Sequence, residues 1–182
     1  ICESAFYDCK NLTKIEIPSN SKLQIIEERA FLGSKIEEIF IPPNVSKICK
    51  YAFHDCDNLI KVEIPTNSNL QIIEENAFYG TKIKEIYFPP SLRELKEGWC
   101  NEIKELTKIN ISPKNQYFIF KENKYLIGKS DENLEEFDKL LFVGRNIKEV
   151  SIPSNIKIIS SHSFENLNIT NIFIPPNVSK IC

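Results

Sequence analysis

The sequence repeats itself with a period of 47 residues, and this repeat constrains the fold more than any other feature. Residues 5–51 align with residues 52–98 without a gap. Each period holds two units, because an Ala-Phe pair recurs at spacings of 25, 22 and 25 residues, with its phenylalanine at Phe6, Phe31, Phe53 and Phe78. A chain built from such units folds as an array in which each unit packs against its neighbours.

Each unit contains a short strand pattern of the form apolar-x-x-apolar-x-apolar. Its seven copies are Leu12/Ile15/Ile17, Ile36/Ile39/Ile41, Leu59/Val62/Ile64, Ile83/Ile86/Phe88, Leu106/Ile109/Ile111, Ile147/Val150/Ile152 and Ile169/Ile172/Ile174. The last two apolar residues lie two apart, which is the strand period, and most of them are β-branched. One such strand per unit predicts a solenoid with a short parallel β-ladder on its concave face, one rung per coil.

A second apolar pattern precedes each Ala-Phe pair and predicts the helical part of an α/β fold. In the first copy Leu23, Ile26, Ala30 and Phe31 follow one another largely at offsets of three and four residues. Such offsets favour one or two turns of α- or 3₁₀-helix, which we expect on the convex side. The small alanine would let the turn approach the sheet. The phenylalanines of successive coils would then stack into a spine.

An insertion at about 112–146 interrupts the array. The strand patterns on either side of it end at Ile111 and Ile152, 41 residues apart, against 22–25 residues elsewhere. Three stretches inside it have strand character, and a turn and a polar loop separate them; the strands are 117–120, 125–127 and 139–143, the turn 122–123 and the loop 130–136. We predict a β-hairpin that projects from one edge of the solenoid. The alternative is that this segment covers the convex flank.

The domain organisation that follows is a single solenoid over residues 1–182, with repeats at 1–111 and 147–182. Residues 175–182 repeat residues 42–49 letter for letter, so the sequence stops within a coil at that end, and it also begins within one. We therefore expect a fragment of a longer array, truncated within repeats at both ends. Because uncapped ends expose the core of a solenoid, we also expect end-to-end self-association.

Composition and charge exclude several classes of partner. The 23 basic and 25 acidic residues give a net charge of −2. Electrostatic binding of nucleic acid over a broad surface needs a clear excess of basic residues. No apolar run approaches the roughly 20 residues that span a bilayer. We expect no nucleic-acid partner and no direct membrane insertion.

Cysteine and histidine spacing offers no candidate catalytic residue. Cys9 and Cys56 occupy equivalent positions two coils apart, roughly 10 Å, which is too far for a disulfide. A seven-residue spacing relates Cys2 to Cys9 and Cys49 to Cys56, so either local bridges or free thiols remain open there. No zinc-type spacing and no glycine-rich phosphate loop is present. We expect no enzyme activity, no metal and no cofactor.

Two outward columns of the predicted ladder form the candidate binding surface. The first alternates in charge and indicates structural ion pairing between adjacent rungs; it reads Lys14, Glu38, Lys61, Glu85, Lys108, Glu149 and Asn171. The second reads Glu16, Phe40, Glu63, Tyr87, Asn110, Ser151 and Phe173. Aromatic residues on a sheet surface are typical interface anchors. We predict partner contacts at Glu16, Phe40, Glu63, Tyr87 and Phe173. Two alternatives stay open: long neighbouring side chains cover the rings, or the double repeat alone places an aromatic residue in every second coil.

The repeating unit resembles the BspA-like (Treponema pallidum-type) leucine-rich repeats, as in the run from Asn58 through Ile64-Pro65 to Ala77-Phe78. Asn115-Gln116-Tyr117 and Lys124-Tyr125-Leu126 are similar to a longer unit of the same family. Such repeats occur in surface proteins of bacteria and trichomonad protists. The resemblance implies an adhesion or surface-antigen module, at the cell surface or outside the cell, that binds host or extracellular-matrix proteins through the ladder. The alternatives are a structural spacer rod that carries a distal domain and an intracellular, cytoplasmic scaffold.

Overall fold

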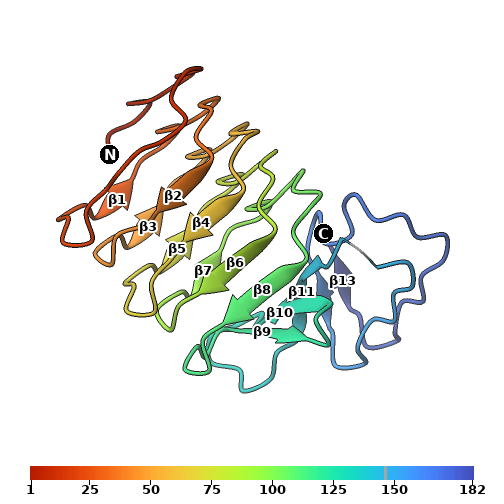
Figure 1. The fold of residues 1–182 in the computed structure, drawn as a ribbon. Coiled ribbons are helices and arrows are strands. Elements are labelled where there is room, and N and C mark those ends of the chain that lie inside the picture. The colour runs from red at the N-terminus through yellow and green to blue at the C-terminus, as the bar shows by residue number, and fades with distance from the viewer. Residues whose placement is uncertain (146) are drawn as a thin grey trace.

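The computed structural model describes residues 1–145 and 147–182 and shows a stack of coils that runs from the N-terminus to the C-terminal region (Figure 1). Most coils contribute two short strands, one to each of two parallel ladders. Bonds between neighbouring coils therefore carry most of the backbone pairing, as in other solenoids.

The first ladder is the one that the strand pattern predicts. It consists of β2 (Glu38–Phe40), β4 (Lys61–Glu63), β6 (Glu85–Phe88) and β8 (Lys108–Ile111). β2 pairs with β4 and β6 with β8, both in parallel, with Ile39 opposite Val62 and Ile86 opposite Ile109. A parallel bridge between Lys14 and Glu38 extends the ladder by one more coil. The prediction of one parallel rung per coil is confirmed here.

The second ladder replaces the predicted helical turns, and the α/β assignment is wrong in this respect. It consists of β1 (Ile25–Ile26), β3 (Lys47–Ile48), β5 (Ile72–Ile73) and β7 (Glu94–Leu95), paired in parallel in that order. The residues that the structure describes contain no α- or 3₁₀-helix, and hence none long and apolar enough to cross a membrane. The solenoid is built from strands and turns.

The turn that follows each second-ladder strand explains why no helix forms. Arg29, Tyr51 and Asn76 adopt positive φ angles of 55°, 59° and 52°, which lie outside the helical region. Every second N–H group of the turn bonds to the neighbouring coil, as the Phe31 nitrogen does to the Ala52 oxygen at 2.8 Å. The groups between them bond only three residues back, as the Leu32 nitrogen does to the Arg29 oxygen. A two-residue strand followed by such a turn gives the same inward offsets of three and four residues that a helix would.

The predicted phenylalanine spine is present at the centre of the coils. The rings of Phe6, Phe31, Phe53 and Phe78 stack in order, with centroid separations of 5.0, 5.2 and 5.3 Å and interplanar angles of 6° or less. The last three rings are fully buried. Trp99 stands next in the column and meets Phe88 edge to face at 5.6 Å, so the regular stack ends where the insertion approaches.

The predicted β-hairpin is confirmed, with its turn at 122–123, but it lies within the stack, so its predicted projection from one edge and the alternative of a cover on the convex flank are both wrong. Strands β9 (Phe118–Lys121), β10 (Tyr125–Gly128) and β11 (Lys139–Val143) form an antiparallel unit. β11 then pairs in parallel with β12 (Ile158–Ile159), and β12 with β13 (Lys180–Ile181), which resumes the array. All four residues of β10 are buried, because one face of the strand packs on the preceding core and the other on the following one.

Candidate binding face

Strand alternation in the first ladder presents one row of side chains to solvent. In β2, Ile39 is buried in the core while Glu38 is exposed and Phe40 is half-buried on the outer side. We call the outer surface formed by residues 13–17 and strands β2, β4, β6 and β8 the ladder face. The predicted contact residues in these coils all lie on it.

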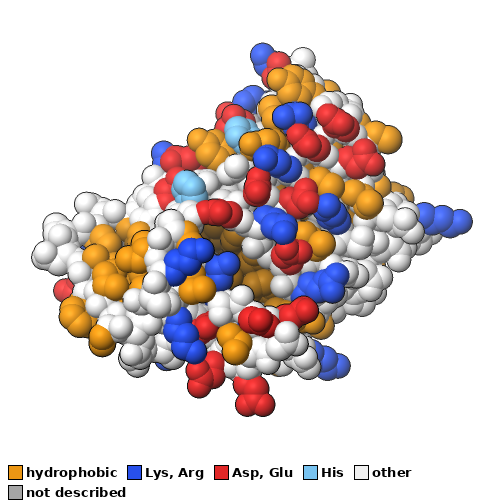
Figure 2. All heavy atoms as spheres, turned by 180° about the vertical axis from the view of Figure 1, so that it is seen from behind, with side chains coloured by type: hydrophobic (Ala, Val, Ile, Leu, Met, Phe, Trp, Pro, Cys, Tyr) orange, Lys and Arg blue, Asp and Glu red, His pale blue; other side chains and the backbone are white. Residues whose placement is uncertain are grey.

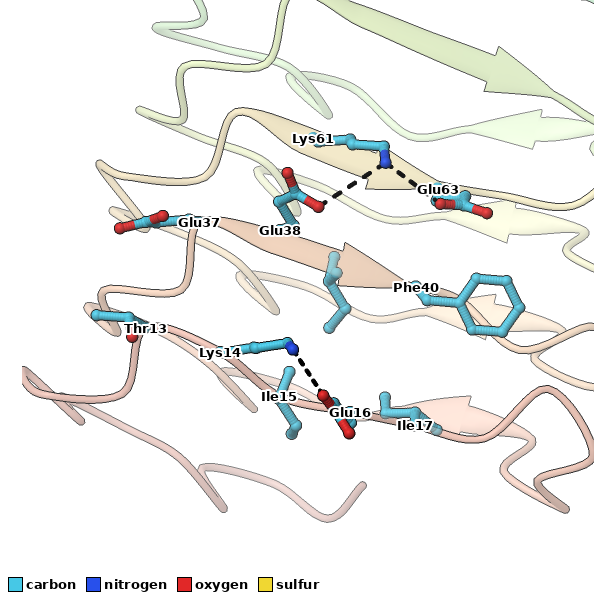
Figure 3. Close-up of a pocket in the computed structure, with 11 residues that line it drawn as sticks. Thr13, Lys14, Ile15, Glu16, Ile17, Glu37, Glu38, Phe40, Lys61 and Glu63 are labelled. Carbon is cyan, nitrogen blue, oxygen red and sulfur yellow. Dashed lines mark ion pairs between the residues drawn. The ribbon is translucent and has the colours of Figure 1, made fainter.

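Two hollows indent the ladder face. The first hollow has a volume of about 450 Å³ and is lined by Thr13, Lys14, Ile15, Glu16, Ile17, Glu37, Glu38, Ile39, Phe40, Lys61 and Glu63 (Figure 3). The second hollow has a volume of about 550 Å³ and is lined by Glu38, Ile60, Lys61, Val62, Glu63, Ile64, Lys84, Glu85, Ile86, Tyr87 and Asn110. The hollows adjoin, because both contain Glu38, Lys61 and Glu63.

The second hollow repeats the first after 47 residues. Lys14 and Glu16 on one rung, followed by Glu38 and Phe40 on the next, form part of the first hollow. The matching set in the second is Lys61, Glu63, Glu85 and Tyr87. The 47-residue repeat of the sequence therefore produces two similar hollows on the surface, and each contains one half-buried aromatic ring.

Exposed ion pairs line the first hollow. Lys14 Nζ lies 2.6 Å from Glu16 Oε1, while Lys61 Nζ lies 3.4 Å from Glu63 and 3.8 Å from Glu38 (Figure 3). The hydrogen bond between Lys14 and Glu16 raises the pKa of the lysine and lowers the pKa of the carboxyl group. The predicted pairing between rungs is confirmed at Glu38–Lys61 and also at Glu85–Lys108, 3.1 Å. Lys14 pairs along its own strand instead.

Not all predicted contact residues share one location. Glu16, Phe40 and Glu63 line the first hollow, and Glu63 and Tyr87 line the second. Phe173 lies outside both, where it bridges to Ser151 beyond the insertion and is 72% exposed. Whether any of them contacts a partner stays a prediction.

The hollows also include residues that the sequence columns missed. Glu37 lines the first hollow and Lys84 the second, and each directly precedes a glutamate of the first outward column. In both coils two charged residues stand next to each other at the start of the strand, and this pair could have indicated that Glu37 and Lys84 also face solvent. Strand alternation assigned only the second residue of each pair to the outer surface.

Charge alone does not distinguish the ladder face from the rest of the molecule. On the side seen in Figure 2, opposite to the view of Figure 1, acidic and basic side chains also intermix, with hydrophobic side chains among them. Ion pairs elsewhere include Lys47–Glu74 and Lys50–Glu75, both at 2.7 Å. The combination of two hollows with half-buried aromatic rings is what characterises the ladder face.

The cysteines are free thiols in this structure, and none is bridged to its neighbour at a seven-residue spacing. Burial raises the pKa of the Cys56 thiol to about 11 and that of Cys100 to about 12, so both stay protonated at neutral pH. The Cys56 sulfur donates to the Phe31 carbonyl at 3.0 Å, which is a structural contact. Within residues 1–145 and 147–182, no group of three histidine, cysteine or acidic side chains could hold a metal ion.

The histidine of the second period is likewise part of the packing. The His54 ring stacks on Tyr79 with 4.3 Å between centroids, and its Nδ1 lies 3.1 Å from an Asp55 carboxylate oxygen. The side chain bridges two coils on the turn side of the molecule. This arrangement gives His54 a packing role.

Comparison with known families gives a match over the whole chain. The model of the "BspA type Leucine rich repeat region" matches in six copies, over residues 1–126 and 100–182. No curated protein matches the sequence significantly.

Several solved structures share the fold. The pneumococcal vaccine antigen PcpA is 23% identical and superposes with a TM-score of 0.88, over 98% of this chain and 43% of its own. A leucine rich cell surface protein from Faecalibacterium prausnitzii is 21% identical, with a TM-score of 0.76 over 98% of this chain and 53% of its own. A leucine-rich repeat protein from Eubacterium ventriosum is also 21% identical, with a TM-score of 0.67 over 89% and 48%. The chain thus spans about half the length of these structures, and the likeness is one of fold.

Proposed function

Because the family model matches it from end to end, the chain belongs to the BspA type leucine-rich repeat family, and we propose that it is a non-enzymatic protein-interaction and adhesion module of a surface protein. Residues 1–182 act in this proposal as one solenoid, with the segment at about 112–146 as an insertion. The proposed location is the cell surface or the extracellular space, and the proposed partners are host or extracellular-matrix proteins. Two proteins of the same fold, a pneumococcal vaccine antigen and a leucine rich cell surface protein, support this location.

One observation carries the proposal: the ladder face places a half-buried aromatic ring, Phe40 or Tyr87, in each of two adjoining hollows. Rings that are already half-buried and have few rotatable bonds bury a large rigid area on binding, which makes them good anchors. Glu16 and Glu63 flank them and would supply polar contacts. Phe173, which is strongly exposed on the next stretch of the array, would form a separate contact.

The competing function is a spacer that binds nothing itself. The stacked phenylalanines and the hydrogen bonds between coils favour it, because they make the N-terminal coils a stiff rod. In a spacer the two hollows would have no role.

Site-specific photocrosslinking separates these functions. A photoreactive amino acid replaces Tyr87 in one variant and Tyr7, which is 54% exposed, in the other. Tyr7 lies on a turn outside the two hollows and serves as the matched control. With extracellular-matrix proteins as the target, we expect a discrete crosslinked product from position 87 only. Equal or absent crosslinking at the two positions would favour the spacer.

A further inference from the structure

We propose that the ladder face recognises a basic peptide segment in the polyproline II conformation, in which an arginine or lysine recurs at every third position. This inference rests on the proposed function, since it names the chemistry of the partner that the same face would bind. The order of residues along the outer column carries it.

The first element is a cation site around Phe40. Lys14 is opposite Glu38 and Phe40 is opposite Glu63 in the parallel register, so the Phe40 ring has Glu16 on the preceding rung and Glu63 on the following one. All three side chains line the first hollow, where the Glu16 carboxylate is turned toward Lys14 (Figure 3). An aromatic ring flanked by two carboxylates attracts a cation twice, through the ring face and through the charges.

The second element is a related site two coils further on, with a carboxylate on one side of the ring only. Tyr87 has Asn110 opposite it on the following rung, and Glu63 lines the same hollow from the preceding one. Neighbouring rungs of a sheet are roughly 4.8 Å apart, which puts the two rings about 10 Å apart. Three residues of a polyproline II helix cover about 9.3 Å and bring the side chain back to the same side of the backbone. A peptide in this conformation that runs along the ladder would therefore bring every third side chain to a ring.

The charge of the two hollows favours a basic segment over an acidic one. Five glutamates and three lysines line the two hollows together, which gives a net charge of −2. Among the residues that the structure describes, Glu37 takes part in no ion pair.

The internal lysines do not block such a ligand. Lys14 and Lys61 pair with Glu16 and Glu63, but all four side chains are more than half exposed. Exposed ion pairs of this kind are weak and exchange readily. A carboxylate also has two oxygens and accepts more than one donor, so an incoming cation can share Glu16 or Glu63 with its lysine.

The test uses three labelled synthetic peptides of about twelve residues, long enough to span roughly 37 Å as a polyproline II helix. The first carries arginine at every third position among small polar residues. The second has the same composition with its arginines adjacent to one another. The third has glutamate in place of arginine. Binding to the full chain is measured by fluorescence anisotropy. The first peptide is expected to bind at least about fivefold more tightly than the second, because once one of its arginines is bound at one ring, another reaches the second ring within the same complex. The third peptide is expected not to bind.

Two variants test whether the peptide binds at the second outward column, which contains Glu16 and Glu63. E16Q/E63Q keeps the shape of the side chains and removes both flanking charges, and it is expected to weaken the first peptide about tenfold. The matched control is E135Q, in the exposed loop between β10 and β11, which should leave the affinity unchanged. Equal affinity for the two basic peptides, an E16Q/E63Q affinity equal to that of the wild type, or no binding of any peptide would each overturn the inference.

Failure of this inference differs from failure of the proposed function. If no basic peptide binds but the photocrosslinker at position 87 still captures a partner, the ladder face is an interaction surface with other chemistry. If position 87 captures nothing above the position 7 control while the spaced peptide binds in a glutamate-dependent manner, the basic-segment inference is supported and matrix proteins are not its source.

Discussion

The rings of Phe31 and Phe53 lie parallel, with their centroids 5.2 Å apart and an angle of 4° between their planes. Each ring belongs to a different coil and is fully buried. The contact repeats on both sides, to Phe6 and to Phe78, so the coils are joined through the centre as well as through their ladders. This stack accounts for the regular translation that gives the ladder face its repeated hollows.

Replacement of Phe53 by alanine should destabilise the chain by about 3–5 kcal/mol, because the change removes buried area and leaves a cavity between two rings. Urea unfolding followed by circular dichroism measures the loss. The matched control is Tyr7→Ala, since Tyr7 is 54% exposed, and its effect should stay within about 0.5 kcal/mol. Equal losses in the two variants would contradict a central aromatic stack.

Stability should fall between pH 9 and pH 11 in a way that depends on Cys56. Burial raises the pKa of this thiol from 9.0 to about 11, so below pH 9 both folded and unfolded chains keep the proton and the contribution is complete. Between pH 9 and pH 11 the Cys56 thiol ionises only in the unfolded chain. This ionisation stabilises the unfolded chain and so lowers the free energy of unfolding by on the order of 2 kcal/mol.

Cys56→Ser isolates this effect. Serine does not titrate in the range, and Thr81 shows that a hydroxyl fits the equivalent position, where it donates to the Phe78 carbonyl at 2.9 Å. The variant should lose less stability than the wild type as the pH rises from 9 to 11, as measured by urea unfolding at each pH. Parallel curves for the two proteins would show that the thiol is not buried as described.

Gly80→Ala should cost about 1–2 kcal/mol. Gly80 has a φ of +69°, and an added Cβ would lie 2.8 Å from the Asp55 Oδ1 atom on the neighbouring coil. The control is Gly144→Ala, where the nearest atom would be an ordinary contact at 3.5 Å and φ is not positive, so no loss is expected. Thermal and urea unfolding of both variants measure the difference. A Gly80→Ala chain as stable as the Gly144→Ala chain would rule out a close approach of these coils.

Asn115 should be the main polar anchor of the insertion. Its amide nitrogen donates to the carbonyls of Pro89 and Leu92, both at 2.8 Å, and its oxygen accepts two N–H groups at the start of β9. Loss of four hydrogen bonds in Asn115→Ala should cost about 2–4 kcal/mol in urea unfolding. Asn44→Ala removes a single exposed bond and should cost less than about 1 kcal/mol. Similar values for both would contradict the anchoring role.

The inward residues of the ladder could be predicted because their pattern is local. Ile39 and Val62 each sit in a strand whose period of two identifies the buried side, and the 47-residue repeat fixes which residues share a rung. The outward position of Phe40 and Tyr87 follows from the same alternation.

The second ladder could not be predicted in the same way. Its strands are only two residues long, and the turns that follow use positive φ at Arg29, Tyr51 and Asn76, none of which is glycine. These residues hold the unusual conformation because the neighbouring coil accepts their N–H groups, which is information that no single unit contains. The place of the insertion was missed for a similar reason, since β11 pairs with β12 across a long stretch of chain.

The hollows of the candidate site also depend on contacts between coils. Strand alternation identifies Glu16, Phe40 and Glu63 as outward residues, but the depth between them depends on how neighbouring side chains lean. The inclusion of Glu37 and Lys84 follows from that geometry.

The most direct test of the central claim, that the ladder face is the binding face, is the affinity of the partner captured at position 87 for three forms of the chain. Titration calorimetry would compare the wild type with F40S/Y87S and with Y7S, which removes an exposed aromatic ring elsewhere. We predict a loss of at least about tenfold in F40S/Y87S, since buried aromatic anchors dominate interface energies, and an unchanged affinity in Y7S. Wild-type affinity in F40S/Y87S would contradict the account.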